Sequence, residues 1–210
     1  MARERTRSAC PRSAWMVVAA LVLGCGAPGE MPIFSEELEQ DAETVLREAT
    51  VTLVPPSCAG VVIDEDLGLT AAHCIDVGMT EVDVRLSSGE VVRAGVTVDR
   101  ARDVALLLFP EPADIVPIAV ADELPRVGEP LFFLGQPTDD AGLQLAELAD
   151  VGRCPTLPAV ENALFTTLDA EPGDSGSPVL NQLLRVVGLV HGGAQCEIAT
   201  PVVGIEDDLR

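Results

Sequence analysis

Short runs of aliphatic and β-branched residues, separated by turn residues, make up most of the chain after residue 50. Runs of this kind are typical of β-strands, and the region shows no long helical periodicity. A core built from them must be largely aliphatic, because the chain has five Phe, one Trp and no Tyr. The sequence therefore predicts an all-β protein of two small barrels or sandwiches, with strands at 51–54, 60–63, 82–86, 91–98, 104–109, 130–134, 143–148, 163–168, 178–180, 184–190 and 200–205.

The charge balance excludes one large class of partner. The 34 acidic and 13 basic residues give a formal net charge of −21, and every basic residue is Arg. A chain this acidic repels a phosphate backbone, so we expect no binding to nucleic acid. The hydrophobic content of 48% is too high for a disordered acidic chain and supports a folded core.

The beginning of the chain has the layout of an export signal. Four arginines within the first 12 residues precede an apolar run at 15–23. A helix of about nine residues spans about 14 Å, well short of the roughly 30 Å that a permanent membrane anchor must cross. The residues VLGC at 22–25 resemble the lipobox of bacterial lipoproteins, which implies cleavage before Cys25 and lipidation of its thiol. The following Gly26 favours an outer-membrane or surface location, and a plain secretory signal is the alternative.

Two further segments differ from the strand pattern. Residues 26–47 combine Pro and Gly with the acidic stretch 36–43, so we expect an acidic tether that contains at most one short helix. Residues 110–125 are rich in Pro and acidic side chains and connect the two sets of runs. The predicted organisation is a signal peptide at 1–24, a lipidated Cys and tether at 25–48, a first β-domain at 49–109, a connection at 110–125 and a second β-domain at 126–210.

The cysteines also indicate an exported protein. Of the six, Cys10 belongs to the signal and Cys25 would carry the lipid. The remaining four form an even set suited to two disulfides in an oxidising compartment, namely Cys58, Cys74, Cys154 and Cys196. No zinc site is predicted, because the chain has no CxxC pair and its two histidines, His73 and His191, lie 118 positions apart.

Three segments contain residue types used in catalysis. The first, LTAAHC at 69–74, contains His73; the second begins at Asp103 and continues into an apolar run; the third, GDSGSP at 173–178, contains Ser175. Cys74 directly follows the His, and Cys58 lies sixteen positions before Cys74. The order His, Asp, Ser in these motifs resembles the trypsin-like (chymotrypsin-fold) serine proteases, over about residues 48–205.

These residue types suit nucleophilic catalysis. A serine hydroxyl is a poor nucleophile near pH 7, so Ser175 needs a base within hydrogen-bond reach. An imidazole, with an unperturbed pKa of about 6.5, can accept that proton and return it to a leaving amine, which is the role expected of His73. Asp103 would orient the imidazole, and the apolar run that follows it would shield its carboxylate from water. The backbone N–H groups of Gly173 and Ser175 are the expected oxyanion donors.

The resemblance implies two six-stranded antiparallel β-barrels with the active site in the cleft between them. It implies a serine endopeptidase that hydrolyses peptide bonds through an acyl-enzyme on Ser175, with no cofactor and no metal. It also implies a disulfide between Cys58 and Cys74. Cys154 and Cys196 are then expected to form the second pair, which departs from the family pattern because the usual partner position, four residues before the nucleophile, holds Glu171.

Substrate preference is left open between three classes. Asp169 lies six residues before Ser175, the offset at which the resemblance places a pocket-base Asp that binds Arg or Lys. His191, Gly192 and Gly193 lie on the expected pocket wall, where bacterial glutamyl endopeptidases place a His that contacts an acidic side chain. We favour Arg or Lys, because the acidic chain attracts cationic substrates, with acidic and small or apolar side chains as alternatives.

Activation and partners complete the expectations. Animal relatives free an amino terminus that pairs with the Asp before the nucleophile, here Asp174, but no matching start is present. We therefore expect local hydrogen bonds to hold Asp174 and activity without processing. The expected partners are a protein or peptide substrate and a membrane reached only through the lipid anchor, and the protein is expected to be a monomer. The alternative from another class is a catalytically inactive surface lipoprotein that binds a peptide or protein.

Overall fold

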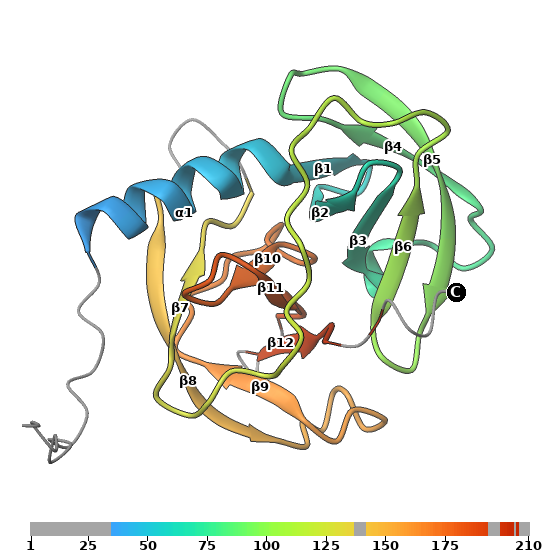
Figure 1. The fold of residues 1–210 in the computed structure, drawn as a ribbon. Coiled ribbons are helices and arrows are strands. Elements are labelled where there is room, and N and C mark those ends of the chain that lie inside the picture. Colours follow the sequence, from blue (N-terminus) through green and yellow to red (C-terminus); the bar gives the residue numbers. More distant parts are fainter. Residues whose placement is uncertain (1–34, 137–141, 193–197, 204, 206–210) are drawn as a thin grey trace, which may run out of the picture. The chain divides into compact units, whose positions relative to one another are not determined.

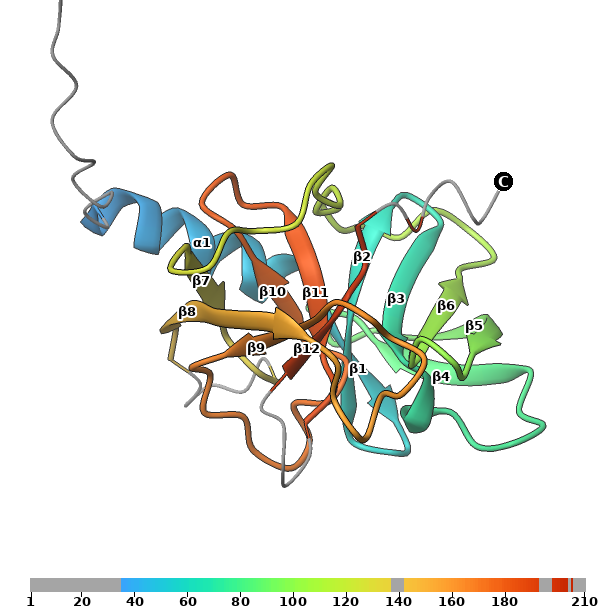
Figure 2. The ribbon, with the colours of Figure 1, turned by 90° about the horizontal axis from the view of Figure 1, so that it is seen from below.

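The computed structural model describes residues 35–136, 142–192, 198–203 and 205. In this part of the chain, strands form two closed six-stranded antiparallel barrels (Figure 1 and, seen from below, Figure 2), which confirms the predicted fold class. The predicted signal peptide, the lipidation site Cys25, the pocket-wall residue Gly193 and the disulfide residue Cys196 lie outside the described residues.

The first barrel closes in the order β1-β2-β3-β6-β5-β4. Alternate side chains point inward; in β4, for example, Val82 and Val84 are buried and their neighbours are not. The strand before His73 was not in the predicted set, because Gly68 and Thr70 interrupt its apolar run. The strands are β1 (Thr50–Val54), β2 (Cys58–Asp64), β3 (Leu67–Ala71), β4 (Glu81–Arg85), β5 (Val91–Asp99) and β6 (Val104–Leu108).

The second barrel closes in the order β10-β11-β12-β9-β8-β7. One strand extends past the predicted run 143–148, since a register shift between Leu148 and Asp150 lets it continue its pairing through polar residues. The final strand begins and ends earlier than the predicted 200–205. The strands are β7 (Pro130–Phe133), β8 (Gln144–Gly152), β9 (Ala163–Thr166), β10 (Pro178–Leu180), β11 (Val186–Val190) and β12 (Ile198–Pro201).

Each barrel has its own apolar core, and a third cluster joins the two. The cluster between them combines Val61 and Leu69 from the first barrel with Phe132 and Leu189 from the second. All four side chains are fully buried. The two barrels therefore pack directly on each other, and residues on facing edges are held at fixed positions.

The connection between the barrels lies along both of them, as its yellow-green ribbon in Figure 1 shows. The N–H of Ile118 donates to the carbonyl of Val62 in β2 at 3.0 Å, and the N–H of Ala121 donates to the carbonyl of Val186 in β11 at 2.9 Å. This segment, predicted as a connection over 110–125, therefore helps to fix one barrel against the other.

Residues 36–48 were predicted as part of a tether with at most one short helix; they form the 14-residue helix α1 (Glu36–Ala49), which packs into the core instead of acting as a spacer. Ser35 caps the helix by accepting the N–H of Leu38 at 3.1 Å. Ala42, Leu46 and Ala49 recur at helical spacing and are fully buried. The acidic composition hid this narrow apolar stripe, and the helix contacts β2 and β7. Within the described residues, no helix has the length and apolar character needed to span a membrane.

Candidate active site

His73 lies on a short 3-10 helix, η1 (Ala72–Cys74), which begins where β3 ends. Cys74 forms a disulfide with Cys58, so the residue after His73 is covalently attached to the start of β2. This is the pairing that the sequence motifs implied. The His73 side chain is 41% exposed, so it is open to a substrate while its backbone is held in place.

Arg100 holds η1 from the turn after β5. Its Nη1 donates to the carbonyl of Ala72 at 2.6 Å, and its Nη2 donates to the carbonyl of Ile75 at 2.5 Å. The carbonyl of Ala72 also accepts the N–H of Ile75 at 3.1 Å, so Arg100 adds a charged donor to this turn. The sequence reasoning did not single out Arg100, since nothing in its local sequence indicates a contact with a segment 25 positions earlier.

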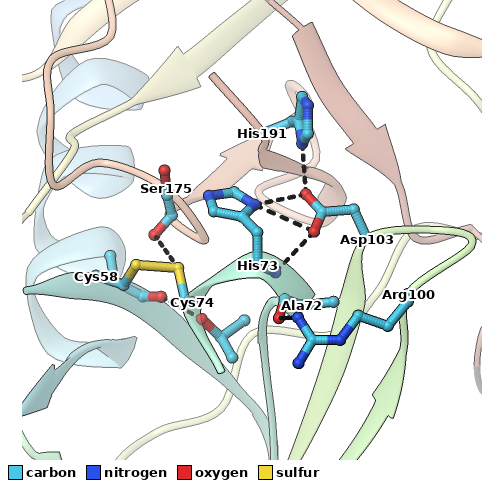
Figure 3. A network of polar contacts seen from close by, with 10 residues as sticks. Cys58, Ala72, His73, Cys74, Arg100, Asp103, Ser175 and His191 are labelled. Atoms are coloured by element: carbon cyan, nitrogen blue, oxygen red, sulfur yellow. Dashed lines mark hydrogen bonds and ion pairs between the residues drawn. A yellow bond between two sulfur atoms is a disulfide. The ribbon is translucent and has the colours of Figure 1, made fainter. Parts of the chain in front are cut away.

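The turn between β5 and β6 brings Asp103 against His73. Asp103 has a φ of 57°, in the left-handed region that Asp tolerates better than most residues. Its Oδ1 accepts the backbone N–H of His73 at 2.9 Å, and its Oδ2 lies 2.8 Å from His73 Nδ1 (Figure 3). The structure thus brings together two predicted site residues that are 30 positions apart.

The charge of Asp103 is stabilised by these contacts. The residue is 5% exposed. Burial raises the pKa of its carboxyl. Hydrogen bonds from His191 and His73 and the charge of His73 lower this pKa by more than burial raises it, so that the result is about 2. Asp103 is therefore ionised at neutral pH, and its negative charge lies directly behind the His73 ring.

Ser175 lies in a tight turn that leads into β10. The N–H of Asp174 donates to the carbonyl of Glu171 at 3.0 Å, and the N–H of Ser177 donates to the carbonyl of Asp174 at 2.9 Å. The N–H of Gly176 donates to the carbonyl of Val190 at the end of β11, at 2.8 Å. The turn is therefore anchored at both sides of Ser175 and is presented as a rigid unit.

The same turn packs closely against the first barrel. The carbonyl of Ser175 accepts the N–H of Ala59 in β2 at 2.8 Å and lies 3.8 Å from the sulfur of Cys74. Gly176 has a φ of 85°, and a Cβ there would lie 2.5 Å from Thr70 Oγ1. In Figure 3, Ser175 lies on the side of the His73 ring opposite Asp103. The three predicted catalytic residues therefore converge where the barrels meet.

Gln136 braces this turn and was missed by the sequence reasoning. Its Nε2 donates to the carbonyl of Gly173 at 2.8 Å and to that of Ser57 at 2.7 Å. Its backbone N–H donates to Asp174 Oδ1 at 3.0 Å, and the N–H of Glu171 donates to Asp174 Oδ2 at 2.8 Å. Asp174 thus has the local hydrogen bonds that we expected. No sequence signal marks Gln136, because its partners lie in distant segments.

His191 follows β11 and is turned toward Asp103. Its Nδ1 lies 2.5 Å from Asp103 Oδ2, and its side chain is 14% exposed. Its ring meets that of His73 edge to face, with centroids 5.3 Å apart and an interplanar angle of 88°. Sequence reasoning placed His191 on the pocket wall and missed this contact with the carboxylate. Its predicted role in substrate binding stays a prediction.

The other predicted specificity residues lie near the Ser175 turn. Asp169 is exposed, and its backbone N–H and carbonyl are hydrogen-bonded to the side-chain amide of Gln144 at 3.4 and 3.2 Å. Gly192 has a φ of 69°, and a Cβ there would lie 3.9 Å from Ser175 Oγ. That distance is an ordinary van der Waals contact, so Gly192 lies directly beside the Ser175 hydroxyl. The role of Asp169 in binding a cationic side chain stays a prediction.

The described residues include one group with metal-binding potential, which is His73, Asp103 and His191. Two imidazoles and a carboxylate are ligands that transition metals use. Here, however, both Nδ1 atoms are directed at Asp103 Oδ2, at 2.8 and 2.5 Å. The hydrogen bonds occupy the directions in which a metal would be coordinated, so the arrangement fits a proton-sharing site better than a metal site.

The second predicted disulfide is only partly within the described residues. Cys154 lies in the loop after β8, is 1% exposed and is disulfide-bonded. Its expected partner, Cys196, lies outside the described residues.

Comparison with known families defines the class of this protein. Residues 58–189 match the trypsin-like peptidase domain, and the chain belongs to this family. None of the curated proteins matches the sequence.

Solved structures with the same fold include three proteases of low sequence identity. The inactive form of the Rv3671c protease superposes with a TM-score of 0.67 at 22% identity, covering 83% of this chain and 94% of its own. The serine endoprotease from Yersinia pestis has a TM-score of 0.66 at 20% identity, covering 86% of this chain and 66% of its own. Deg5 has a TM-score of 0.63 at 20% identity, covering 82% of this chain and 92% of its own. These likenesses show the fold alone.

Proposed function

We propose that this chain is a serine endopeptidase that cleaves peptide bonds through an acyl-enzyme on Ser175. The observation that carries the proposal is the pairing of His73 Nδ1 with the buried carboxylate of Asp103 at 2.8 Å, with Ser175 at the opposite side of the ring (Figure 3). This arrangement leaves His73 Nε2 available as the base for a hydroxyl. The membership in the trypsin-like peptidase domain family supports the same activity.

We propose the following chemical steps for these residues. Ser175 Oγ attacks the substrate carbonyl while His73 Nε2 takes its proton, and the C–N bond then breaks as His73 returns that proton to the leaving amine. A water molecule attacks the acyl-enzyme, again with His73 as base, and releases the carboxylic acid and Ser175. Asp103 stabilises the imidazolium that forms transiently in both halves of the reaction.

The turn around Ser175 supplies the donors for the developing oxyanion. The N–H groups of Asp174, Gly176 and Ser177 already have carbonyl acceptors. Among the described residues, those of Gly173 and Ser175 have none, and Gly173 has a φ of 112° that places its peptide differently from its neighbours. We assign these two N–H groups to the oxyanion, where loss of one donor typically costs about 3 to 4 kcal/mol of transition-state stabilisation.

A fluorophosphonate probe tests this assignment, because it reacts with an activated serine hydroxyl whatever the substrate preference. We expect labelling of the folded, oxidised protein, none for Ser175→Ala and weak labelling for His73→Ala. Ser177→Ala is a matched control, since Ser177 is in the same turn but is fully buried, and its hydroxyl has no partner among the described residues. Absence of labelling in the wild type would favour the inactive peptide-binding lipoprotein instead.

We infer a preference for cleavage after Arg or Lys. The position of Asp169 six residues before Ser175 and the formal net charge of −21 support this choice. We expect Asp169→Asn to lower kcat/KM for Arg and Lys peptides and to leave small apolar residues unaffected. Glu147→Gln is the control, because it removes an equal charge from an exposed position on β8. Equal losses in both variants would assign the preference to net charge alone.

We also infer that the enzyme is active without a freed amino terminus, because backbone N–H groups of Gln136 and Glu171 already hold Asp174. The chain contains no Lys, so acetylation of amines with a mild reagent modifies only the amino terminus. We expect acetylated protein to label as well as untreated protein. Loss of labelling would indicate that the terminal amine is needed.

For localisation, we propose export and lipidation at Cys25. The disulfide between Cys58 and Cys74 supports an oxidising compartment. In a bacterial host, incorporation of a fatty-acid analogue and partition into detergent should both be lost in Cys25→Ser. Unchanged partition of that variant, without lipid on the wild type, would favour the plain secretory signal.

A further inference from the structure

One carboxylate in this protein is shared by two imidazoles. Asp103 Oδ2 lies 2.8 Å from Nδ1 of His73 and 2.5 Å from Nδ1 of His191. The Asp103 side chain is 7% exposed, so its charge is compensated mainly by these protein groups rather than by water. Each ring can donate its Nδ1–H to the same oxygen, and Figure 3 shows the two rings approaching the carboxylate from different sides.

The position of His191 is fixed by its neighbours. The preceding residue, Val190, donates its N–H to the carbonyl of Ser177 at 2.9 Å and accepts the N–H of Gly176 at 2.8 Å. His191 is therefore tied to the turn that carries Ser175. Its side chain is 14% exposed, against 41% for His73, so the two imidazoles sit in different surroundings on one carboxylate.

The other charged groups near this cluster are directed elsewhere. Arg100, on the turn before β6, donates to the carbonyls of Ala72 and Ile75. Arg102, on the same turn, pairs with Asp99, with Nε and Oδ2 3.7 Å apart. Asp174, on the Ser175 turn, accepts N–H groups from Gln136 and Glu171. From η1 and the turn before β6, the titratable groups that contact the His191 ring are therefore His73 and Asp103.

We propose that His191 is a positioning residue that acts on His73 through Asp103, both by holding the carboxylate and by competing with His73 for its negative charge. One carboxylate can neutralise only one imidazolium, so a proton bound by His191 disfavours a second proton on His73. Competition for one carboxylate therefore favours the neutral form of His73, which is the form that acts as a base. The kinetic consequences rest on the proposed peptidase function.

Two substitutions separate the two parts of this role. His191→Asn keeps an N–H donor for Asp103 but cannot bind a proton, whereas His191→Ala removes both. We expect kcat to fall on the order of 10-fold to 100-fold in His191→Ala, with little change in KM, because a buried carboxylate loses a donor. His191→Asn should recover most of that loss.

The pH dependence of kcat/KM distinguishes this role from a merely structural one, which would leave the profile unchanged. In His191→Asn, the donor to Asp103 remains but no second imidazole can take up a proton beside the carboxylate, which favours the imidazolium of His73. We expect the acid limb of kcat/KM to shift upward by roughly 0.3 to 1 pH unit relative to the wild type, and to follow a single titration. An unshifted or downward-shifted limb would overturn the competition. A change confined to KM would instead support contact between His191 and substrate.

A second measurement does not depend on peptidase activity. The chain has two histidines, so the NMR spectrum of imidazole protons in Ser175→Ala contains only the groups in question. We expect the two rings to titrate as a coupled pair, and His73 to titrate at a higher pH once His191 is replaced by Asn. Independent titrations would refute the proposal even for an active enzyme. Coupled titrations without activity would leave it standing and refute only the peptidase.

Discussion

At the residue scale, Asp103 is the group on which the site converges. Its φ of 57° turns the carboxylate toward η1, where it receives the backbone N–H and Nδ1 of His73. One carboxylate therefore orients the His73 imidazole through two contacts, one with its ring nitrogen and one with the backbone of the same residue. A substitution here changes charge, geometry and stability together.

The depressed pKa of Asp103 predicts a pH-dependent contribution to stability. Because the folded-state pKa is about 2 and the ordinary value is 3.8, the contribution is fully present above the ordinary value and is lost as the pH falls toward 2. A shift of this size corresponds to about 2 kcal/mol. The test compares the free energy of unfolding of the wild type with that of Asp103→Asn, measured by urea denaturation. We expect the advantage of the wild type to be about 2 kcal/mol larger at pH 6 than at pH 2. An advantage that does not change with pH would contradict this prediction.

Arg100 provides a second prediction at this scale. Arg100→Met keeps the length of the side chain but removes the donors to the carbonyls of Ala72 and Ile75. Because the arginine is exposed, we expect only about 1 kcal/mol of lost stability, but a loss of kcat/KM on the order of 10-fold as η1 loosens. Arg93→Met, which breaks an exposed pair with Asp83 on β4, is the control and should change kcat/KM by less than about twofold.

At the element scale, α1 is part of the folded domain. Leu46 is fully buried in the cluster that joins the barrels, and it lies on the same helical stripe as Ala42 and Ala49. We expect Leu46→Ala to lower the free energy of unfolding by about 2 to 4 kcal/mol, since it leaves a cavity in this cluster. Leu183→Ala, at a position 76% exposed, should change it by less than about 0.5 kcal/mol. Equal, small effects would mean that the helix is dispensable.

At the scale of the whole molecule, the site depends on close contact between the barrels. Gly176 approaches β2 and β3 so closely that a Cβ would lie 2.5 Å from Thr70 Oγ1 and 2.9 Å from the backbone nitrogen of Ala71. The turn that carries Ser175 can reach His73 only because this position has no side chain.

Gly176→Ala is therefore expected to lower stability much more than the same substitution at another glycine with a similar backbone conformation. Gly89 has a φ of 88°, close to the 85° of Gly176, but no atom lies within 4 Å of its would-be Cβ. Gly89→Ala should cost only the left-handed strain, about 1 to 2 kcal/mol, measured by thermal or urea unfolding. Gly176→Ala should cost at least about 2 kcal/mol more and abolish probe labelling. Similar costs would show that the barrels can separate to accept the methyl group.

Sequence pattern was enough to predict the all-β class, the two sets of strands and the residue types of the site. Apolar periodicity is a local property, and the motifs around His73, Asp103 and Ser175 are short and ordered along the chain. The same local reasoning allowed a short helix at α1 but did not predict its packing into the core, because three apolar positions among acidic residues, Ala42, Leu46 and Ala49, do not reveal what they contact.

The surroundings of the three motif residues could not be predicted in this way, because they depend on how the chain folds. Three hydrogen-bonding side chains around the site contact segments that are distant in sequence. Arg100 contacts η1, Gln136 contacts Gly173 and His191 contacts Asp103. Side chains of these types are common in any chain, and hydrogen bonds have a range of about 3 Å, so their partners depend on how the barrels close and pack. Local pattern predicts elements and reactive groups, whereas the contacts that orient those groups arise only when the two barrels come together.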